Sequence, residues 1–151
     1  MAQVVYQGYY DDLAAGYVVG TTDLRARLVM SNTTIADAGQ EDAQTISDFT
    51  TLDEVDGVGY AMLDLENVTV AYDSANDRLV IDADDGDFDG GTGSIAASSR
   101  QVTRVLIERY VDGTDPNDVP WLSIDIGPYT TSGGAFDVIW NSLGIAYVGS
   151  A

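Results

Sequence analysis

Short stretches of alternating hydrophobic and polar residues recur along the chain, separated by turns rich in Gly, Asp, Asn, Ser and Thr. A period of two predicts half-buried strands. Residues 24–30 are the clearest case, because Arg25, Arg27 and Val29 stand between hydrophobic neighbours. Further strands are predicted over 60–65, 67–72, 78–82, 102–111, 121–126, 136–140 and 145–148. This spacing predicts an all-β fold, an antiparallel β-sandwich or barrel.

Three segments depart from simple alternation. The continuous hydrophobic triplet 105–107 makes 102–111 the candidate central strand, covered on both faces. Residues 41–54 contain Ile46, Phe49 and Leu52 near helical spacing, but their Ser and Thr content favours a single helical turn. Residues 83–100, rich first in Asp and Gly and then in Ser and Ala, are predicted to form a long surface loop.

The N-terminal segment is unusually aromatic. The boundary is placed so that residues 1–22 form an N-terminal arm or a first strand, and residues 23–151 form a single β domain. If the segment is an arm, its tyrosines suit contact with a neighbouring subunit, because they offer large, rigid contact areas. The candidate interaction residues are Val4, Val5, Tyr6, Tyr9, Tyr10, Leu13 and Tyr17.

Composition excludes several classes of function. The chain has 151 residues, enough for one domain, with 25 acidic and 6 basic side chains and a net charge of -19. Such a charge repels nucleic acid, so no nucleic-acid partner is expected. The chain has no His and no Cys, which removes imidazole and thiol chemistry and the usual zinc and haem ligands. We therefore expect no catalytic residues, no cofactor and no enzyme activity.

The type of charge indicates adaptation to salt. All six basic residues are Arg, and Asp far outnumbers Glu. At about 0.1 M salt the Debye length is about 10 Å, and so many carboxylates repel one another. At about 1 M salt it falls to about 3 Å, and the repulsion is largely screened. A halophilic setting is the interpretation that this pattern favours. An ordinary acidic protein kept soluble by its charge is the alternative.

No export signal or membrane span is evident. Residues 1–10 lack a basic region followed by a hydrophobic one, and no stretch approaches the about 18 hydrophobic residues that a spanning helix needs. Synthesis in the cytoplasm and no membrane partner are therefore expected.

Residues 85–90 form the one motif that suggests a metal. Asp85, Asp87, Asp89 and Gly90 fit the opening of a calcium-binding loop, in which alternate carboxylates converge on the cation. The twelfth position, where a bidentate carboxylate is expected, holds Ala96. A solvated Asp-rich turn is therefore the favoured interpretation, and no metal site is assigned.

A carbohydrate-binding β-sandwich is the main alternative from another functional class. Trp121, Tyr129 and Trp140 would stack on sugar rings if they were exposed. Trp140 shares a predicted strand face with Phe136 and Val138, which favours a place in the core.

Several runs resemble the small virion proteins of tailed double-stranded DNA viruses. They are DLRARLVMSNTT (23–34), TISDFTTLDE (45–54), GYA (59–61), NDR (76–78), IDADD (81–85), IDIG (124–127), VIWN (138–141) and GI (144–145). The resemblance spans roughly residues 23 to 146, rests on strand and turn segments, and carries no catalytic residues. This chain departs from the family in having no Lys, which suggests a virus of a halophilic host, with archaea among the candidate hosts.

The resemblance implies a capsid decoration protein on the outside of the head. Its partners would be the major capsid protein and further copies of itself, as a homo-oligomer that is a trimer if it occupies three-fold positions. A tail or fibre component is the alternative within the virion.

Overall fold

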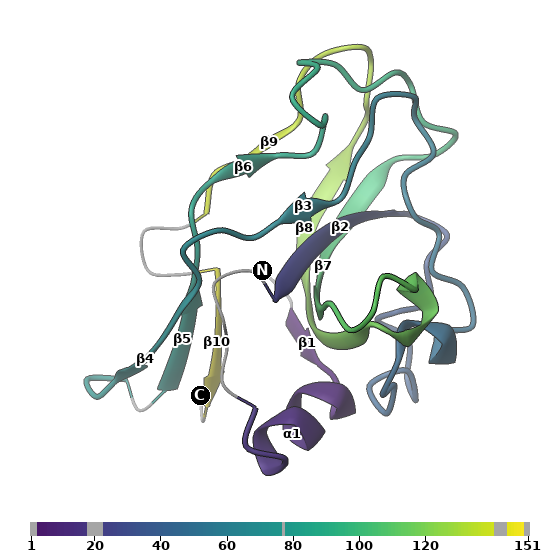
Figure 1. The fold of residues 1–151 in the computed structure, drawn as a ribbon. Coiled ribbons are helices and arrows are strands. Elements are labelled where there is room, and N and C mark those ends of the chain that lie inside the picture. Colours follow the sequence, from purple (N-terminus) through teal and green to yellow (C-terminus); the bar gives the residue numbers. More distant parts are fainter. Residues whose placement is uncertain (1–2, 18–22, 77, 141–144, 150–151) are drawn as a thin grey trace.

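The computed structural model describes residues 3–17, 23–76, 78–140 and 145–149, which form three antiparallel sheets, one α-helix and two short 3-10 turns (Figure 1). The five-stranded sheet has the order β1 (Gln3–Val5), β8 (Val119–Tyr129), β7 (Val102–Arg109), β2 (Leu24–Met30), β3 (Leu63–Asp64). The three-stranded sheet has the order β10 (Ala146–Gly149), β5 (Arg78–Asp82), β4 (Thr69–Asp73). β6 (Gly86–Asp87) pairs with β9 (Asp137–Val138), and the helical elements are α1 (Gln7–Ala14), η1 (Ile46–Asp48) and η2 (Asp115–Asn117). The predicted class is confirmed at this level: the fold is mostly β and antiparallel.

The prediction of a central strand at 102–111 is confirmed. β7 lies third in the five-stranded sheet and pairs with β2 on one side and β8 on the other. Val105 and Ile107 belong to the larger hydrophobic cluster, whereas Leu106 belongs to a second cluster on the opposite face. The triplet is continuously hydrophobic because both faces of the strand are covered.

β2 corrects one prediction. Its alternation predicted a half-buried strand, yet Arg27 is 1% exposed and Val29 is fully buried. The segment 31–55, which contributes Ile35 and Phe49, covers the second face of the sheet. A charged residue in an alternating strand normally faces solvent. Arg27 instead forms a buried ion pair with Glu108.

Other predicted strands are confirmed in position but differ in extent. Residues 60–65 and 136–140 contribute only the two-residue strands β3 and β9. The strand predicted at 145–148 is β10, at one edge of the three-stranded sheet. The strand predicted at 67–72 is β4, and the single turn predicted within 41–54 is η1.

The segment 83–100 is not simply a surface loop. Phe88 and Ile95 are fully buried, and both belong to the larger hydrophobic cluster. That cluster also contains Leu28 and Val105 of the five-stranded sheet and Ile81 of the three-stranded sheet. The segment therefore contributes side chains to the hydrophobic core that the two sheets share.

Candidate interaction surfaces

The N-terminal segment packs against its own chain. β1 extends the five-stranded sheet by pairing with β8, from Gln3 with Ile124 to Val5 with Leu122. Tyr6 is fully buried, and its hydroxyl hydrogen-bonds to the Ile35 carbonyl oxygen at 2.9 Å and to Ser123 Oγ at 2.8 Å. Of the two alternatives left open by the sequence, the structure has the first strand.

An ion pair fixes α1 to the sheet. Arg109 donates from Nε and Nη2 to the carboxylate of Asp12 at 2.7 and 2.8 Å, and Trp121 Nε1 donates to the same carboxylate at 2.8 Å. The Arg109 guanidinium also lies 4.6 Å from the centre of the Tyr17 ring, and the Tyr9 ring meets Trp121 edge to face. The hydrogen bonds that Arg109 donates to Asp12 are the largest contribution that raises the pKa of Arg109 above its ordinary value.

Two of the seven candidate interaction residues point into solvent. The side chains of Tyr10 and Leu13 are 48% and 46% exposed, whereas Tyr6 and Tyr9 are buried. Val4, Val5 and Tyr17 are half-buried against the two hydrophobic clusters of the same chain. An intermolecular role for the segment stays a prediction, and in this fold it rests on Tyr10 and Leu13.

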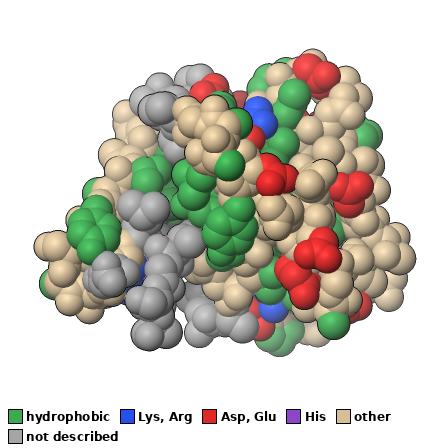
Figure 2. All heavy atoms as spheres, turned by 90° about the horizontal axis from the view of Figure 1, so that it is seen from below, with side chains coloured by type: hydrophobic (Ala, Val, Ile, Leu, Met, Phe, Trp, Pro, Cys, Tyr) green, Lys and Arg blue, Asp and Glu red, His purple; other side chains and the backbone are tan. Residues whose placement is uncertain are grey.

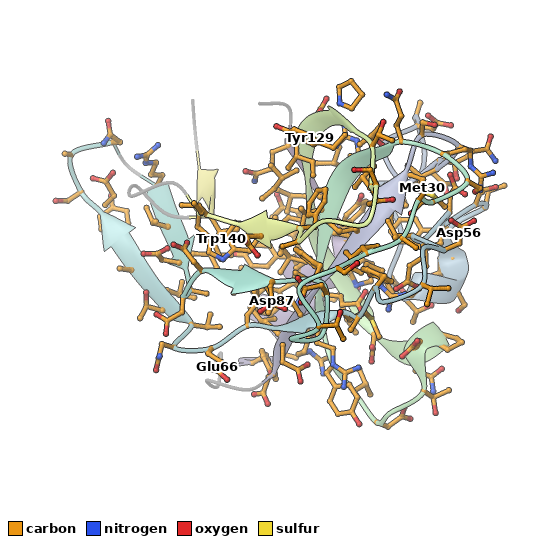
Figure 3. All side chains as sticks on the ribbon, turned by 90° about the horizontal axis from the view of Figure 1, so that it is seen from above. Met30, Asp56, Glu66, Asp87, Tyr129 and Trp140 are labelled. Atoms are coloured by element: carbon orange, nitrogen blue, oxygen red, sulfur yellow. The ribbon has the colours of Figure 1, made fainter. Side chains whose placement is uncertain are left out.

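A shallow hydrophobic groove lies where β8 ends and β9 runs. It has a volume of about 400 Å³, and its lining residues are Ile126, Tyr129, Ala135, Phe136, Asp137, Val138 and Ile139. Tyr129 is 52% exposed and Ile139 is 81% exposed, so the groove has a hydrophobic rim as well as a hydrophobic floor. Tyr129 meets the ring of Phe136 edge to face at 6.0 Å, which holds the aromatic wall in place. Figure 3 shows Tyr129 and Trp140 at separate places on the side of the molecule that carries β9.

The tryptophans do not form a sugar-binding platform with Tyr129. Trp121 is 1% exposed and lies inside the larger hydrophobic cluster, so the exposure that stacking on a sugar ring requires is absent at this residue. Trp140 packs partly buried against the same cluster and donates from Nε1 to the Asp84 carbonyl oxygen at 3.0 Å.

The carboxylates of the calcium-like motif do not converge. Asp85 accepts the Trp140 amide at 2.7 Å, and Asp87 accepts the Gly91 amide at 3.2 Å. Asp89 is 2% exposed. Within the described residues, no group of three or more acidic side chains is placed to hold a metal ion.

A buried polar network on β2 and β7 has no counterpart in the sequence expectations. Arg27 donates to both carboxylate oxygens of Glu108, at 2.8 and 2.5 Å, and to Glu54 at 2.8 Å. Tyr60 donates to Glu54 at 2.9 Å and accepts the Leu28 amide at 3.1 Å. Arg27 and Glu108 occupy alternating strand positions at which charged side chains normally face solvent. They are buried here because the segment 31–55 covers that face of the sheet. Burial raises the pKa of Glu108 to about 7, because its effect is larger than the opposite effect of the Arg27 guanidinium, which lowers the pKa.

Neither a protein family, nor a curated protein, nor a solved structure matches this chain. No helix in the described segments is long and hydrophobic enough to cross a membrane.

Asp118 is a further buried carboxylate, close to the polar network of Arg27, Glu54, Tyr60 and Glu108. It is fully buried, its Oδ1 accepts the Val111 amide at 2.9 Å, and its Oδ2 is the one buried side-chain oxygen or nitrogen in the described segments without a hydrogen-bond partner. Burial raises the pKa of Asp118. An acid whose pKa is raised by folding stabilises the fold at low pH, and this stabilisation is lost as pH rises.

We expect Asp118→Asn to flatten the pH dependence of stability. The wild-type melting temperature should fall as the pH rises toward 8, because Asp118 and Glu108 ionise in a buried site. Asparagine can still accept the Val111 amide but carries no charge, so at pH 8 the variant should melt about 2–4 °C higher than wild type. Asp42→Asn, which removes an exposed carboxylate, is the control for net charge. If Asp118→Asn and Asp42→Asn raise the melting temperature at pH 8 equally, the pH dependence does not come from Asp118.

Proposed function

We propose that the protein is a structural component of a virion, of the head decoration type, that binds the outside of the capsid shell. The observation that carries the proposal is the hydrophobic groove with exposed Tyr129 and Ile139 on a chain of net charge -19. Contiguous exposed hydrophobic patches often mark sites of protein–protein contact. The resemblance of residues 23–146 to small virion proteins supplies the kind of partner, the major capsid protein.

The placement of the charged groups supports binding rather than catalysis. The buried carboxylates of Asp12 and Glu108 are each bound in bidentate fashion by an arginine of the same chain. In these positions they connect α1 and β2 to the central strand. We therefore propose a non-enzymatic protein without a cofactor, located on the virion.

We also propose that the two larger sheets are the layers of a β-sandwich. The support is the shared cluster that contains Leu28 and Val105 from one sheet, Ile81 from the other, and Phe88. A sandwich of this kind leaves the edges of its sheets available for contacts between subunits.

Shell binding is expected to tighten with salt. Copies of charge -19 on one lattice repel one another, and the repulsion falls as the Debye length shrinks from about 10 Å at 0.1 M to about 3 Å at 1 M, while burial of the groove is retained. Co-sedimentation with empty head shells of the source virus, over a series of KCl concentrations, measures this. Tyr129→Ser combined with Ile139→Ser should weaken binding at least about 10-fold.

Val58→Ser is the matched control, because Val58 is 84% exposed and lies outside the groove. Binding to isolated tails and not to heads would replace the proposal with a tail component. Binding that is strongest at low salt would contradict both the halophilic interpretation and the role of screening.

A further inference from the structure

β4 is an exposed strand at the edge of the three-stranded sheet. It has five residues, more than any other edge strand in the described segments, and it pairs with β5 without a bulge, from Thr69 with Asp82 to Asp73 with Arg78. Figure 1 shows β4 and β5 projecting at the lower left, away from the five-stranded sheet. Its hydrophobic side chains are exposed, Val70 by 41% and Tyr72 by 62%.

This edge has few of the features that usually prevent pairing between strands. Natural edge strands are protected by charged side chains, proline, bulges or short length. Residues 67–72 contain neither a charge nor a proline, although 21% of the chain is charged. At the end of the strand, Asp73 is paired with Arg78 at 3.0 Å. On the face seen in Figure 2, the acidic side chains lie mainly toward the right and the top of the view.

We propose that β4 pairs with β4 of a second copy, antiparallel, about a two-fold axis at Ala71. In this register Ala71 faces its own counterpart, Val70 faces Tyr72 of the other copy, and Thr69 faces Asp73. Pairs of aromatic and β-branched residues across antiparallel strands are favourable. The two three-stranded sheets would become one continuous sheet of six strands.

Two observations favour a second copy of β4 as the occupant. Because copies of charge -19 repel each other, contact is least opposed where the surface is uncharged, and residues 67–72 are such a place. The other edge of this sheet, β10, runs parallel to β4, since both are antiparallel to β5. A head-to-tail contact of β4 with β10 that keeps the same face of both sheets on one side would therefore pair parallel strands, which is the less stable arrangement.

The contact between two β4 strands involves only five residues from each copy, so we expect a weak dimer. The interface lies below the about 1,200 Å² of stable complexes, so the dimer should be weak in dilute solution and grow with protein and salt concentration. The inference is independent of shell binding. A two-fold contact of this kind would link neighbouring copies and does not build a trimer.

Cysteine cross-linking tests the register, because the chain has no cysteine of its own. Ala71→Cys places two thiols opposite each other on the axis, at a Cβ separation of about 4.5–5.5 Å that a disulfide can bridge with a small adjustment. Under mild oxidation at about 2 M KCl, where charge repulsion is screened, this variant should form dimers at least about 10-fold faster than Val58→Cys. Val58 is exposed and lies outside the edge strand, so it reports random collision.

Sedimentation of the unmodified chain against Ala71→Glu gives a second, independent readout. Two glutamates facing each other on the axis should abolish the concentration-dependent dimer, whereas Val58→Glu should preserve it. Equal cross-linking at positions 71 and 58, or a dimer or trimer that Ala71→Glu leaves intact, would overturn the inference. Shell binding by monomeric Ala71→Glu would leave the proposed function standing, so the two can fail separately.

Discussion

Replacing Arg27 by leucine is expected to destabilise the fold by about 3–5 kcal/mol, because it leaves the buried Glu108 carboxylate without its partner. Glu108 is fully buried and receives two of the guanidinium hydrogen bonds. A domain of this size has a total stability of about 5–15 kcal/mol, so the variant should be partly unfolded at neutral pH. Denaturant unfolding at pH 5 and pH 8 measures the effect.

The pH dependence of stability distinguishes the loss of Arg27 from the loss of Glu108. Glu108, whose pKa burial already raises to about 7, can take up a proton when Arg27 is lost, so Arg27→Leu should regain stability at pH 5. Arginine stays charged at every accessible pH, so the loss in Glu108→Leu should persist there. Glu54 keeps part of its surface in water and its bond from Tyr60.

The double variant Arg27→Leu with Glu108→Leu is the decisive control. If the single losses come from an uncompensated buried charge, removing both charges should restore most of the stability. Additive losses in the double variant would mean that packing, and not charge, explains the single variants.

Removing residues 2–17 is expected to abolish folding, not merely assembly. The deletion takes away the edge strand β1 and the buried rings of Tyr6 and Tyr9, and it leaves Trp121 and Arg109 without the carboxylate of Asp12. Asp12→Ala alone should cost about 3 kcal/mol, since two donors lose their acceptor. Thermal melts and far-ultraviolet circular dichroism measure both effects.

Tyr10→Ser combined with Leu13→Ser is the matched control on the exposed side of the same segment. It should change stability by less than about 1 kcal/mol, because both side chains are about half exposed. If the segment contacts other copies or the shell, this variant should fold normally and associate about 10-fold more weakly. Normal folding after the deletion would contradict the structural role of β1 and α1.

The sequence predicts the strands well because alternation follows directly from strand geometry. β2, β5, β7 and β8 lie where the pattern places them, and the hydrophobic triplet in β7 correctly indicates a strand covered on both faces. Periodicity reports which side chains share a face, but not whether an irregular segment covers that face. For this reason the burial of Arg27 and Val29 beneath 31–55 was not predicted.

The helix α1 was missed for a related reason. Residues 7–14 include Gly8, two tyrosines and two aspartates, none of which strongly favours a helix. Distant contacts hold it instead, through Asp12 with Arg109 and through the Gly8 amide with the Ala43 carbonyl oxygen. Of the interaction surfaces, the groove combines strand ends with the segment 135–139, so only the three-dimensional fold brings its walls together.

The docking of β1 on β8 has a consequence for synthesis. Tyr6 bonds to Ser123, 117 positions further along the chain, and Asp12 bonds to Trp121, 109 positions further. The ribosome therefore releases β1 and α1 long before the strand that receives them exists. Closing so long a loop is slow, and until then the hydrophobic rings of Tyr6 and Tyr9 have no core to enter. The five-stranded sheet can be completed only after translation has passed β8, which makes the nascent chain the stage at which this protein is most exposed to aggregation.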